Sequence, residues 1–266
     1  MKIKLVQSKL LETLILIVFS CALCIQGHAK HWDKIEPQPF DKYQGEVVHH
    51  SDGDTLDIKL TSGPFKGKIT RVRMLNIDTP ESVFQGLSQG PIAEEASKVL
   101  KTKLAPIGTK VKVEYGPVTL GPWRRSLATI YRGRKNINRE LIRLGLAFPI
   151  FFAPHIDKHR SYWRAANEAK KKRRGVWDPK EKVEVPHRFR LKNSNRNEAN
   201  FVGHMKTKTI VPGSYINFVP EKELVFFPTN SDGQISLRNF LKKYELDREG
   251  WAFLETANAC EGAFVY

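Results

Sequence analysis

Residues 44–76, QGEVVHHSDGDTLDIKLTSGPFKGKITRVRMLN, decide the fold class of this chain. Apolar residues recur in three short runs, at 44–50, 55–60 and 68–76, and the turn signals DG and SGP separate these runs. Short apolar runs bounded by glycine, proline and aspartate are typical of β-strands joined by tight turns. The stretch therefore predicts three consecutive β-strands.

Downstream of this stretch, helical and extended spacing alternate. Apolar residues follow helical spacing at 92–104, and runs typical of strands return at 111–115 and 127–131. Further helices are predicted from Asn136, which can act as a cap, and across 157–174. Five strands with an inserted helix predict an α+β protein built on a five-stranded OB-type β-barrel with about three helices.

The barrel unit, residues 43–180, is followed by a different kind of sequence. Residues 181–200 are polar and rich in asparagine, so they are predicted to form a linker. Residues 201–266 hold short apolar runs and a predicted helix at 236–244, without a motif of recognisable chemistry. We therefore expect a C-terminal extension of unknown fold, either a small second domain or an appendage packed on the barrel.

Residues 1–29 have the pattern of an export signal. Lysines precede an apolar run at 13–25, which is 13 residues long, whereas a membrane-spanning helix needs about 20. Small residues at the cleavage position predict processing after Ala29. This leaves a polar leader at 30–42 and a secreted or periplasmic chain without a transmembrane span. Two alternatives stay open, a lipid anchor through Cys21 and an uncleaved membrane anchor.

The composition fits an exported globular protein with a polyanionic partner. The 266 residues include 44 Lys and Arg against 28 Asp and Glu, a formal net charge of +16. The hydrophobic share of 41% excludes a disordered or multi-span membrane protein. The positive excess favours nucleic acid, anionic lipid or acidic glycan as partner. Two of the three cysteines lie in the predicted signal, so Cys260 has no intrachain disulfide partner after processing.

Four sequence pieces combine acidic and basic residues in a way that suits phosphodiester chemistry. They are DGDT at 52–55, RMLNIDTPE at 73–81, RRSLA at 124–128 and NRELIRLGLA at 138–147. Taken singly, each has an ordinary structural explanation, such as a tight turn for DGD or a helix start for TPE. Their joint occurrence favours an active site.

The acidic residues of these pieces are candidates for holding a metal ion. Hard cations prefer oxygen ligands and can neutralise the charge that gathers on a phosphate during cleavage. Asp54 and Asp78 are predicted to be carboxylate ligands of one ion, with the backbone carbonyl of Thr79 and waters completing the shell. Asp52 is a secondary candidate that holds the loop or a metal-bound water.

The basic residues and the glutamate match the remaining demands of the reaction. Guanidinium forks fit phosphate geometry and stay charged, so Arg73 and Arg125 are predicted to clamp the phosphate and stabilise the transition state. Glu81 is predicted to orient or deprotonate the attacking water. The residue types alone therefore suggest a phosphodiesterase.

The same pieces resemble the staphylococcal nuclease (thermonuclease) family. The resemblance covers about residues 43–178 and is carried by the run IDTPE with an upstream arginine, following DGDT, and by the spacing from RRSLA to GLA. It implies an SNase-like OB-fold domain whose metal ligands, two catalytic arginines and glutamate are the residues named above. It further implies calcium as the metal, with other divalent ions possible, and cleavage of DNA and RNA to leave 3′-phosphate ends.

One loop departs from the family pattern. The family has an acidic residue and then an aromatic-Gly-Arg run, whereas this chain has GPWRR at 121–125, with Arg124 in the glycine position. Arg125 keeps the family spacing to the following strand and is preferred, and Arg124 is a secondary candidate for the phosphate role. The nucleoside-stacking tyrosines of the family fall near Phe151 and Ala153. Phe151 is a secondary candidate for stacking on a base, and Phe152 is the alternative.

The sequence as a whole predicts an exported metal-dependent nuclease acting on DNA, RNA or both. Strong sequence specificity is not expected, because the predicted residues address phosphate rather than base edges. No small-molecule cofactor is expected. One alternative is a non-catalytic nucleic-acid-binding OB-fold module of the cell envelope, against which the persistence of all five principal side chains argues. Another is an envelope protein whose C-terminal region does the main work while the barrel is a scaffold.

Overall fold

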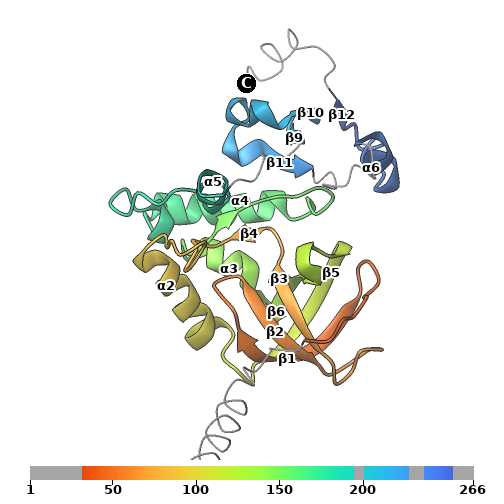
Figure 1. Ribbon diagram of the computed structural model, residues 1–266, viewed down its shortest axis with the longest axis vertical. Coiled ribbons are helices and arrows are strands. Elements are labelled where there is room, and N and C mark those ends of the chain that lie inside the picture. Colours follow the sequence, from red (N-terminus) through yellow and green to blue (C-terminus); the bar gives the residue numbers. More distant parts are fainter. Residues whose placement is uncertain (1–31, 195–200, 228–236, 254–266) are drawn as a thin grey trace, which may run out of the picture. The chain divides into compact units, whose positions relative to one another are not determined.

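The structure, a computed structural model, describes residues 32–194, 201–227 and 237–253 (Figure 1). The predicted signal peptide at 1–29, including the lipid-anchor alternative, and Cys260 lie outside the described residues. Within the part of the chain that is described, none of the helices combines the length and the apolar composition that a membrane crossing requires.

Five strands close into the barrel that the sequence predicts. Their bounds are β1 Lys42–His50, β2 Thr55–Leu60, β3 Ile69–Met74, β5 Lys110–Leu120 and β6 Ser126–Arg132. Neighbours pair antiparallel in the order β3-β2-β1-β5-β6, and a parallel pairing of β3 with β6 closes the ring. Short strands complete the unit, namely β4 Ile77–Asp78 paired with β8 Phe148–Pro149, and β7 Lys135–Asn136 beside β6.

Helices accompany this barrel, and together with it they confirm the predicted α+β OB-type fold. Their bounds are α2 Pro91–Val99 with a π-helical turn at Leu100–Leu104, α3 Ile137–Arg143, α4 His159–Lys171, α5 Pro186–Lys192 and α6 Leu237–Lys243. Short 3-10 helices lie at Pro122–Arg124, Gly175–Trp177, Gly213–Phe218 and Glu221–Glu223. The side chain of Asn136 caps α3 by accepting a hydrogen bond from the amide of Arg139, at 2.9 Å.

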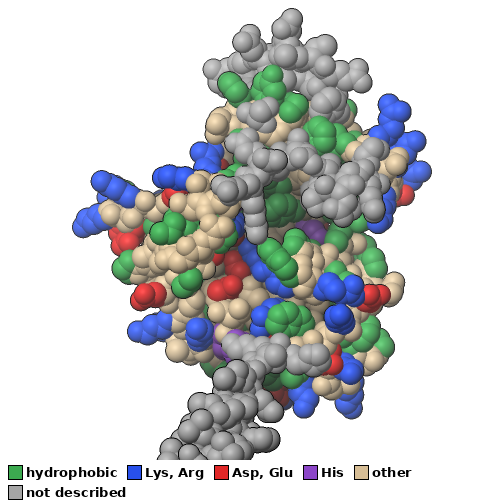
Figure 2. Space-filling view, viewed as in Figure 1, with side chains coloured by type: hydrophobic (Ala, Val, Ile, Leu, Met, Phe, Trp, Pro, Cys, Tyr) green, Lys and Arg blue, Asp and Glu red, His purple; other side chains and the backbone are tan. Residues whose placement is uncertain are grey.

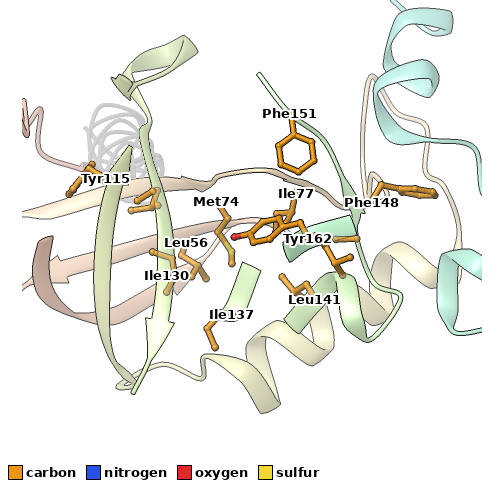
Figure 3. Packing of buried hydrophobic residues seen from close by; sticks show 14 of the residues in the cluster. Leu56, Met74, Ile77, Tyr115, Ile130, Ile137, Leu141, Phe148, Phe151 and Tyr162 are labelled. Atoms are coloured by element: carbon orange, nitrogen blue, oxygen red, sulfur yellow. The ribbon is translucent and has the colours of Figure 1, made fainter. Parts of the chain in front are cut away.

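The barrel interior and the inner faces of α3 and α4 form one apolar core (Figure 3). Strand β3 shows how the sequence separates core from surface, because side chains alternate between the two faces of a strand. Val72 and Met74 are buried, whereas Arg71 and Arg73 lie on the other face. Strand periodicity thus directs Arg73 away from the core while fixing its position along the barrel.

A buried asparagine ties the core helix to the part of the barrel that leads into β4. Asn138 at the start of α3 is fully buried. Its Oδ1 accepts from the amide of Ile130 at 3.0 Å, and its Nδ2 donates to the carbonyl oxygens of Leu75 at 2.9 Å and of Ala128 at 3.4 Å. One side chain therefore satisfies backbone groups of β6 and of the turn after β3.

Replacing Asn138 with alanine should lower the free energy of unfolding by about 2–3 kcal/mol, because buried backbone groups then lose their partners. The matched control is Asn136→Ala, which removes the α3 cap and should lower it by about 1 kcal/mol. Urea denaturation followed by circular dichroism measures both. A loss for Asn138→Ala no larger than that for Asn136→Ala would contradict this account.

The C-terminal region forms a second sheet that packs on the barrel unit. Its strands are β9 Phe201–His204, β10 Thr209–Pro212, β11 Leu224–Phe227 and β12 Ala252–Phe253, in the order β11-β9-β10-β12. The amide of Phe226 donates to the carbonyl of Phe151, and the amide of Ala153 donates to the carbonyl of Phe226, both at 2.8 Å. Val225 and Phe227 also belong to the same apolar core as the barrel residues. The region therefore contacts the barrel unit through backbone hydrogen bonds and a shared apolar core.

The segment predicted as a linker, 181–200, differs from that expectation because it contains α5. Pro186 stands in the first turn of this helix, where its missing N–H is tolerated. Phe189 packs edge-on against Phe84, with ring centroids 6.4 Å apart, and His187 packs edge-on against Phe226 at 5.2 Å. Aromatic packing thus orders a stretch whose composition is that of a linker. Residues 195–200 lie outside the described part.

Candidate active site

Strand register brings the predicted site residues to one end of the barrel. Thr55 on β2 lies opposite Arg73 on β3, and Arg73 lies opposite Leu127 on β6. Asp54 immediately precedes Thr55, and Arg125 stands two residues before Leu127. Residues that are 71 positions apart, Asp54 and Arg125, therefore flank the same arginine.

Asp78 joins this group through the turn between β3 and β4. Asn76 in this turn has a φ of 62°, in the left-handed region that asparagine tolerates better than most residues. Nη2 of Arg73 then lies 3.1 Å from Oδ2 of Asp54 and 3.0 Å from Oδ1 of Asp78. Its Nη1 donates to two neighbouring carbonyl oxygens at 2.8 and 2.9 Å. Both terminal nitrogens of Arg73 therefore hold the two carboxylates and the turn in place.

A close contact between two loops fixes Asp54. Its Oδ2 accepts from the amide and the hydroxyl of Thr79, both at 3.1 Å. A Cβ on Gly53 would lie 2.7 Å from the Thr79 hydroxyl, so the loops approach this closely only because the residue is glycine. Oδ1 of Asp52 accepts from the amide of Asp54 at 3.0 Å and closes the turn. The sequence predicts that Gly53 lies in a turn, but it does not predict that Gly53 allows this close approach to Thr79.

Arg125 presents a guanidinium to the same end of the barrel. Its Nε is buried and has no hydrogen-bond partner among the described residues, and its guanidinium carbon lies 5.0 Å from the centre of the exposed Trp123 ring. Nη2 of Arg124 instead lies 2.5 Å from Oε1 of Glu36, on the surface. Trp123 and Arg124 have φ values of 57° and 55°, so two successive left-handed residues turn the neighbouring arginines in different directions. The arrangement favours Arg125 over Arg124 for the phosphate role.

One site residue, Arg190 on α5, was not predicted from the sequence. Its Nη1 lies 3.0 Å from Oδ1 of Asp78, and its Nη2 lies 2.8 Å from Oδ2 of the same carboxylate. Nη1 also contacts Oε1 of Glu81. Arg190 belongs to a polar stretch without a motif, and it lies 112 residues from Asp78 in the chain. The only sequence signal was the run PHRFRLK at 186–192, in which a proline starts a short helix.

Burial changes the acidity of these groups. Burial, followed by the charge of a neighbouring carboxylate, raises the pKa of Asp52 to about 7. Burial also raises the pKa of Glu81, while Arg190 opposes that effect. Burial and the neighbouring Arg73 lower the pKa of Arg125, although a guanidinium stays charged at any working pH. The site therefore concentrates charge where water is partly excluded.

The structure corrects the expectation that Phe151 stacks on a base. Its side chain is 1% exposed, and its ring packs against His159 at 4.7 Å and Tyr162 at 6.3 Å, within the core (Figure 3). The exposed neighbour is Phe152, which stacks on Phe226 with ring centroids 5.1 Å apart. Phe151 points into the core and Phe152 points out of it. The spacing of these residues from the sequence motif does not predict which of the two rings is buried.

The donor set fits a hard cation, with few protein ligands. Among the described residues, no group of three or more His, Cys, Asp or Glu side chains is arranged to hold a metal ion. Asp54 and Asp78 nevertheless contact the same nitrogen of Arg73, so their oxygens converge. Two carboxylates with backbone and water oxygens are donors that Ca²⁺ accepts. On the face shown in Figure 2, acidic and basic side chains lie beside each other near the centre of the view.

Comparisons with known proteins indicate one family. Residues 71–179 match the family model described as "Staphylococcal nuclease homologue". The chain is 33% identical over 148 residues to the thermonuclease of Staphylococcus intermedius, which covers 53% of the chain and 83% of that protein. It is 30% identical over 132 residues to the thermonuclease of Staphylococcus hyicus, which covers 50% of the chain and 74% of that protein.

A further match covers about three-quarters of the chain. The chain is 28% identical over 208 residues to the endonuclease YhcR of Bacillus subtilis, which covers 74% of the chain. The chain spans only 17% of the length of that endonuclease. Given the two thermonucleases, the family model and the barrel with its convergent carboxylates and arginines, the chain belongs to the staphylococcal nuclease family of phosphodiester-hydrolysing enzymes.

Proposed function

We propose that the protein is an exported, divalent-cation-dependent nuclease that cleaves DNA, RNA or both and leaves 3′-phosphate ends. The observation that carries the proposal is the convergence of Asp54 and Asp78 on one nitrogen of Arg73. Similarity to thermonucleases and to an endonuclease supports the choice of nucleic acid as substrate. Export, to the outside of the cell or to the periplasm, rests on the pattern of residues 1–29.

Asp54, Asp78 and the carbonyl of Thr79 are the residues proposed to hold the cation. A bound divalent cation, with Ca²⁺ as the first choice, would neutralise charge on the phosphate oxygens. Arg73 keeps the two carboxylates together through its terminal nitrogens. Thr79 keeps Asp54 oriented through its amide and hydroxyl.

The reaction itself is assigned to Arg125 and Glu81. Arg125 binds the non-bridging phosphate oxygens, because its Nε is buried and donates no hydrogen bond within the described residues, and because it lies close to Arg73. Glu81 orients a water and takes its proton as the water oxygen attacks phosphorus. For a 3′-phosphate product, the bond from phosphorus to the 5′-oxygen breaks, and the leaving oxygen acquires a proton. None of these groups reads a base edge, so we expect cleavage that tolerates sequence.

Incubation of the purified protein with end-labelled DNA and RNA tests the proposal. We expect cleavage with Ca²⁺, loss of cleavage with excess chelator, and recovery when Ca²⁺ is restored, because the donor set is made of oxygens. A polymerase cannot extend a 3′-phosphate end. Products that are extended only after phosphatase treatment therefore carry a 3′-phosphate. Mg²⁺ and Mn²⁺ run in parallel identify the preferred ion.

Two results would contradict different parts of the proposal. Full cleavage in excess chelator would remove the cation from the mechanism. Binding of DNA or RNA without cleavage under any divalent ion would favour a nucleic-acid-binding module with this fold. The chelator saturated with Ca²⁺ is the control for effects of the chelator itself.

A further inference from the structure

Arg190 binds two of the carboxylates that the proposed mechanism requires. Both oxygens of Asp78 accept from its guanidinium, at 3.0 and 2.8 Å, and one oxygen of Glu81 contacts the same nitrogen as Oδ1 of Asp78. The side chain of Asp78 is almost fully buried, and that of Arg190 is about three-quarters buried. A bidentate pair in such surroundings is a strong, directional interaction.

The packing of helix α5 fixes the position of Arg190. Phe189 packs on Phe84, and His187 packs on Phe226, so the helical turn that leads to Arg190 is anchored by two aromatic contacts. Nε2 of Gln89 donates to the carbonyl of Glu184 at 2.7 Å, which joins the segment before α5 to the loop after Glu81. The approach of Arg190 to the carboxylates is therefore built into the fold.

The contacts of Arg190 bear directly on cation binding at Asp78. A carboxylate has roughly four lone-pair sites, and Asp78 already accepts from two terminal nitrogens of Arg190 and one of Arg73. A hard cation binds carboxylate oxygens at about 2.3–2.6 Å, and at that distance it would lie beside the Arg190 guanidinium. Like charges at such separation repel strongly where water is partly excluded.

The charge balance of the site leads to the same conclusion. The acidic residues Asp54, Asp78 and Glu81 lie among three guanidiniums, those of Arg73, Arg125 and Arg190. Without Arg190, the same acids would outnumber the arginines and attract a divalent cation more strongly. Arg190 thus supplies, from within the chain, part of the positive charge that the cation would bring.

We propose that Arg190 is a tethered competitor of the divalent cation, so that cation binding at Asp78 requires the guanidinium to withdraw. The inference rests on the proposed function, because it concerns the same cation site. Arg190 acts through Asp78 and Glu81 and is a positioning residue in this assignment. It sets the cation concentration at which the site becomes competent.

Calcium affinity measured by isothermal titration calorimetry on the full chain tests this assignment without nucleic acid. Arg190→Gln removes the charge and leaves a shorter, neutral polar side chain, and we expect it to bind Ca²⁺ at least about tenfold more tightly than the unmodified protein, a difference of about 1.4 kcal/mol. Arg190→Lys should lie between the two, because it keeps the charge but loses the fork. The matched control is Arg188→Gln on the same helix, whose nearest acidic contact is Glu221 at 3.8 Å. Its affinity should be unchanged.

Thermal unfolding supplies a second readout. The Ca²⁺-induced rise in Tm should be larger for Arg190→Gln than for the unmodified protein, because a ligand stabilises in proportion to the logarithm of its concentration over Kd. Circular dichroism of each variant shows whether it is folded. If Arg190→Gln does not fold, Arg190→Lys still has to show tighter Ca²⁺ binding than the unmodified protein.

The possible results separate this inference from the proposed function. Equal or weaker Ca²⁺ binding by Arg190→Gln overturns the competitor role, even if DNA is still cleaved. A fall in kcat of Arg190→Gln at saturating Ca²⁺ with unchanged affinity also overturns it and assigns Arg190 to the phosphate instead. Failure of the unmodified protein to cleave nucleic acid with any divalent ion refutes the proposed function, and this is read from a different assay.

Discussion

Cleavage by the Arg125→Ala variant should be about 10²–10³-fold slower than that by the unmodified protein, because one preorganised donor to the phosphate oxygens is lost. Arg125 is the site arginine whose Nε is buried without a hydrogen-bond partner in the described part of the chain. Burial lowers its pKa, because desolvation disfavours the charged form. Such a group stabilises little in the absence of substrate, so we expect the free energy of unfolding to stay the same or rise slightly.

Activity and stability therefore change independently in this variant. Initial rates on labelled DNA at saturating Ca²⁺ measure the first, and urea denaturation measures the second. Arg124→Ala is the matched control, because Arg124 pairs with Glu36 at the surface and should leave the rate within about twofold, as expected for a surface ion pair. Arg125→Lys should recover only part of the rate, since lysine lacks the planar fork. Retained activity in Arg125→Ala with lost activity in Arg124→Ala would reverse the assignment.

The barrel can be predicted from the sequence for one physical reason, whereas the site residues were predicted from their chemistry and from the resemblance to the staphylococcal nuclease family. Strand periodicity and turn residues act over a few positions, and once the strands are placed, a closed sheet leaves few registers that bury Val72 and Met74. Asp54 and Arg73 follow, because they stand at fixed distances from those strands. Local patterns thus determine a long-range arrangement in this half of the chain.

Arg190 and Phe151 show where such reasoning stops. The position of α5 depends on packing between aromatic residues that are distant in the chain, such as Phe189 and Phe84, and no local pattern encodes that contact. Phe151 and Phe152 are neighbours in a segment with irregular backbone, where no period decides which ring enters the core. In both cases a tertiary contact, rather than a motif, decides whether a side chain can meet substrate or metal.

Because Arg73 and Arg190 both contact Asp78, substitutions in this group are expected to affect protein stability. Asp78 is fully buried, and its charge is compensated by two guanidiniums. Removing one partner of a buried ion pair is strongly destabilising, because it leaves the other charge without compensation. Substitutions of Asp78 or Arg73 therefore change stability and activity together, which makes Arg125 and Glu81 the more informative positions for testing catalysis.

The Glu81→Gln variant should cleave DNA about 10²–10⁴-fold more slowly, because glutamine has nearly the same shape but cannot take a proton from the attacking water. Glu81 is partly buried, and its amide donates to Oε1 of Gln89 at 3.0 Å, so its backbone position does not depend on its charge. Burial raises the pKa of Glu81, which is the direction expected for a group that accepts a proton. We therefore expect the loss to appear in kcat, with little change in KM, since Arg125 and the proposed cation ligands are intact.

Single-turnover cleavage of labelled DNA at saturating Ca²⁺ measures this step directly, because product release does not contribute. The matched control is Glu221→Gln, which replaces another acid whose pKa is raised by burial, close to Arg188 and not bonded to Asp78 in the described residues. Its rate should stay within about threefold of the unmodified protein, as for substitutions away from the reacting groups. If Glu81→Gln kept the normal rate, the proton would have to leave through another group. Asp52, whose pKa is raised to about 7 at the same end of the barrel, would then be the next residue to replace.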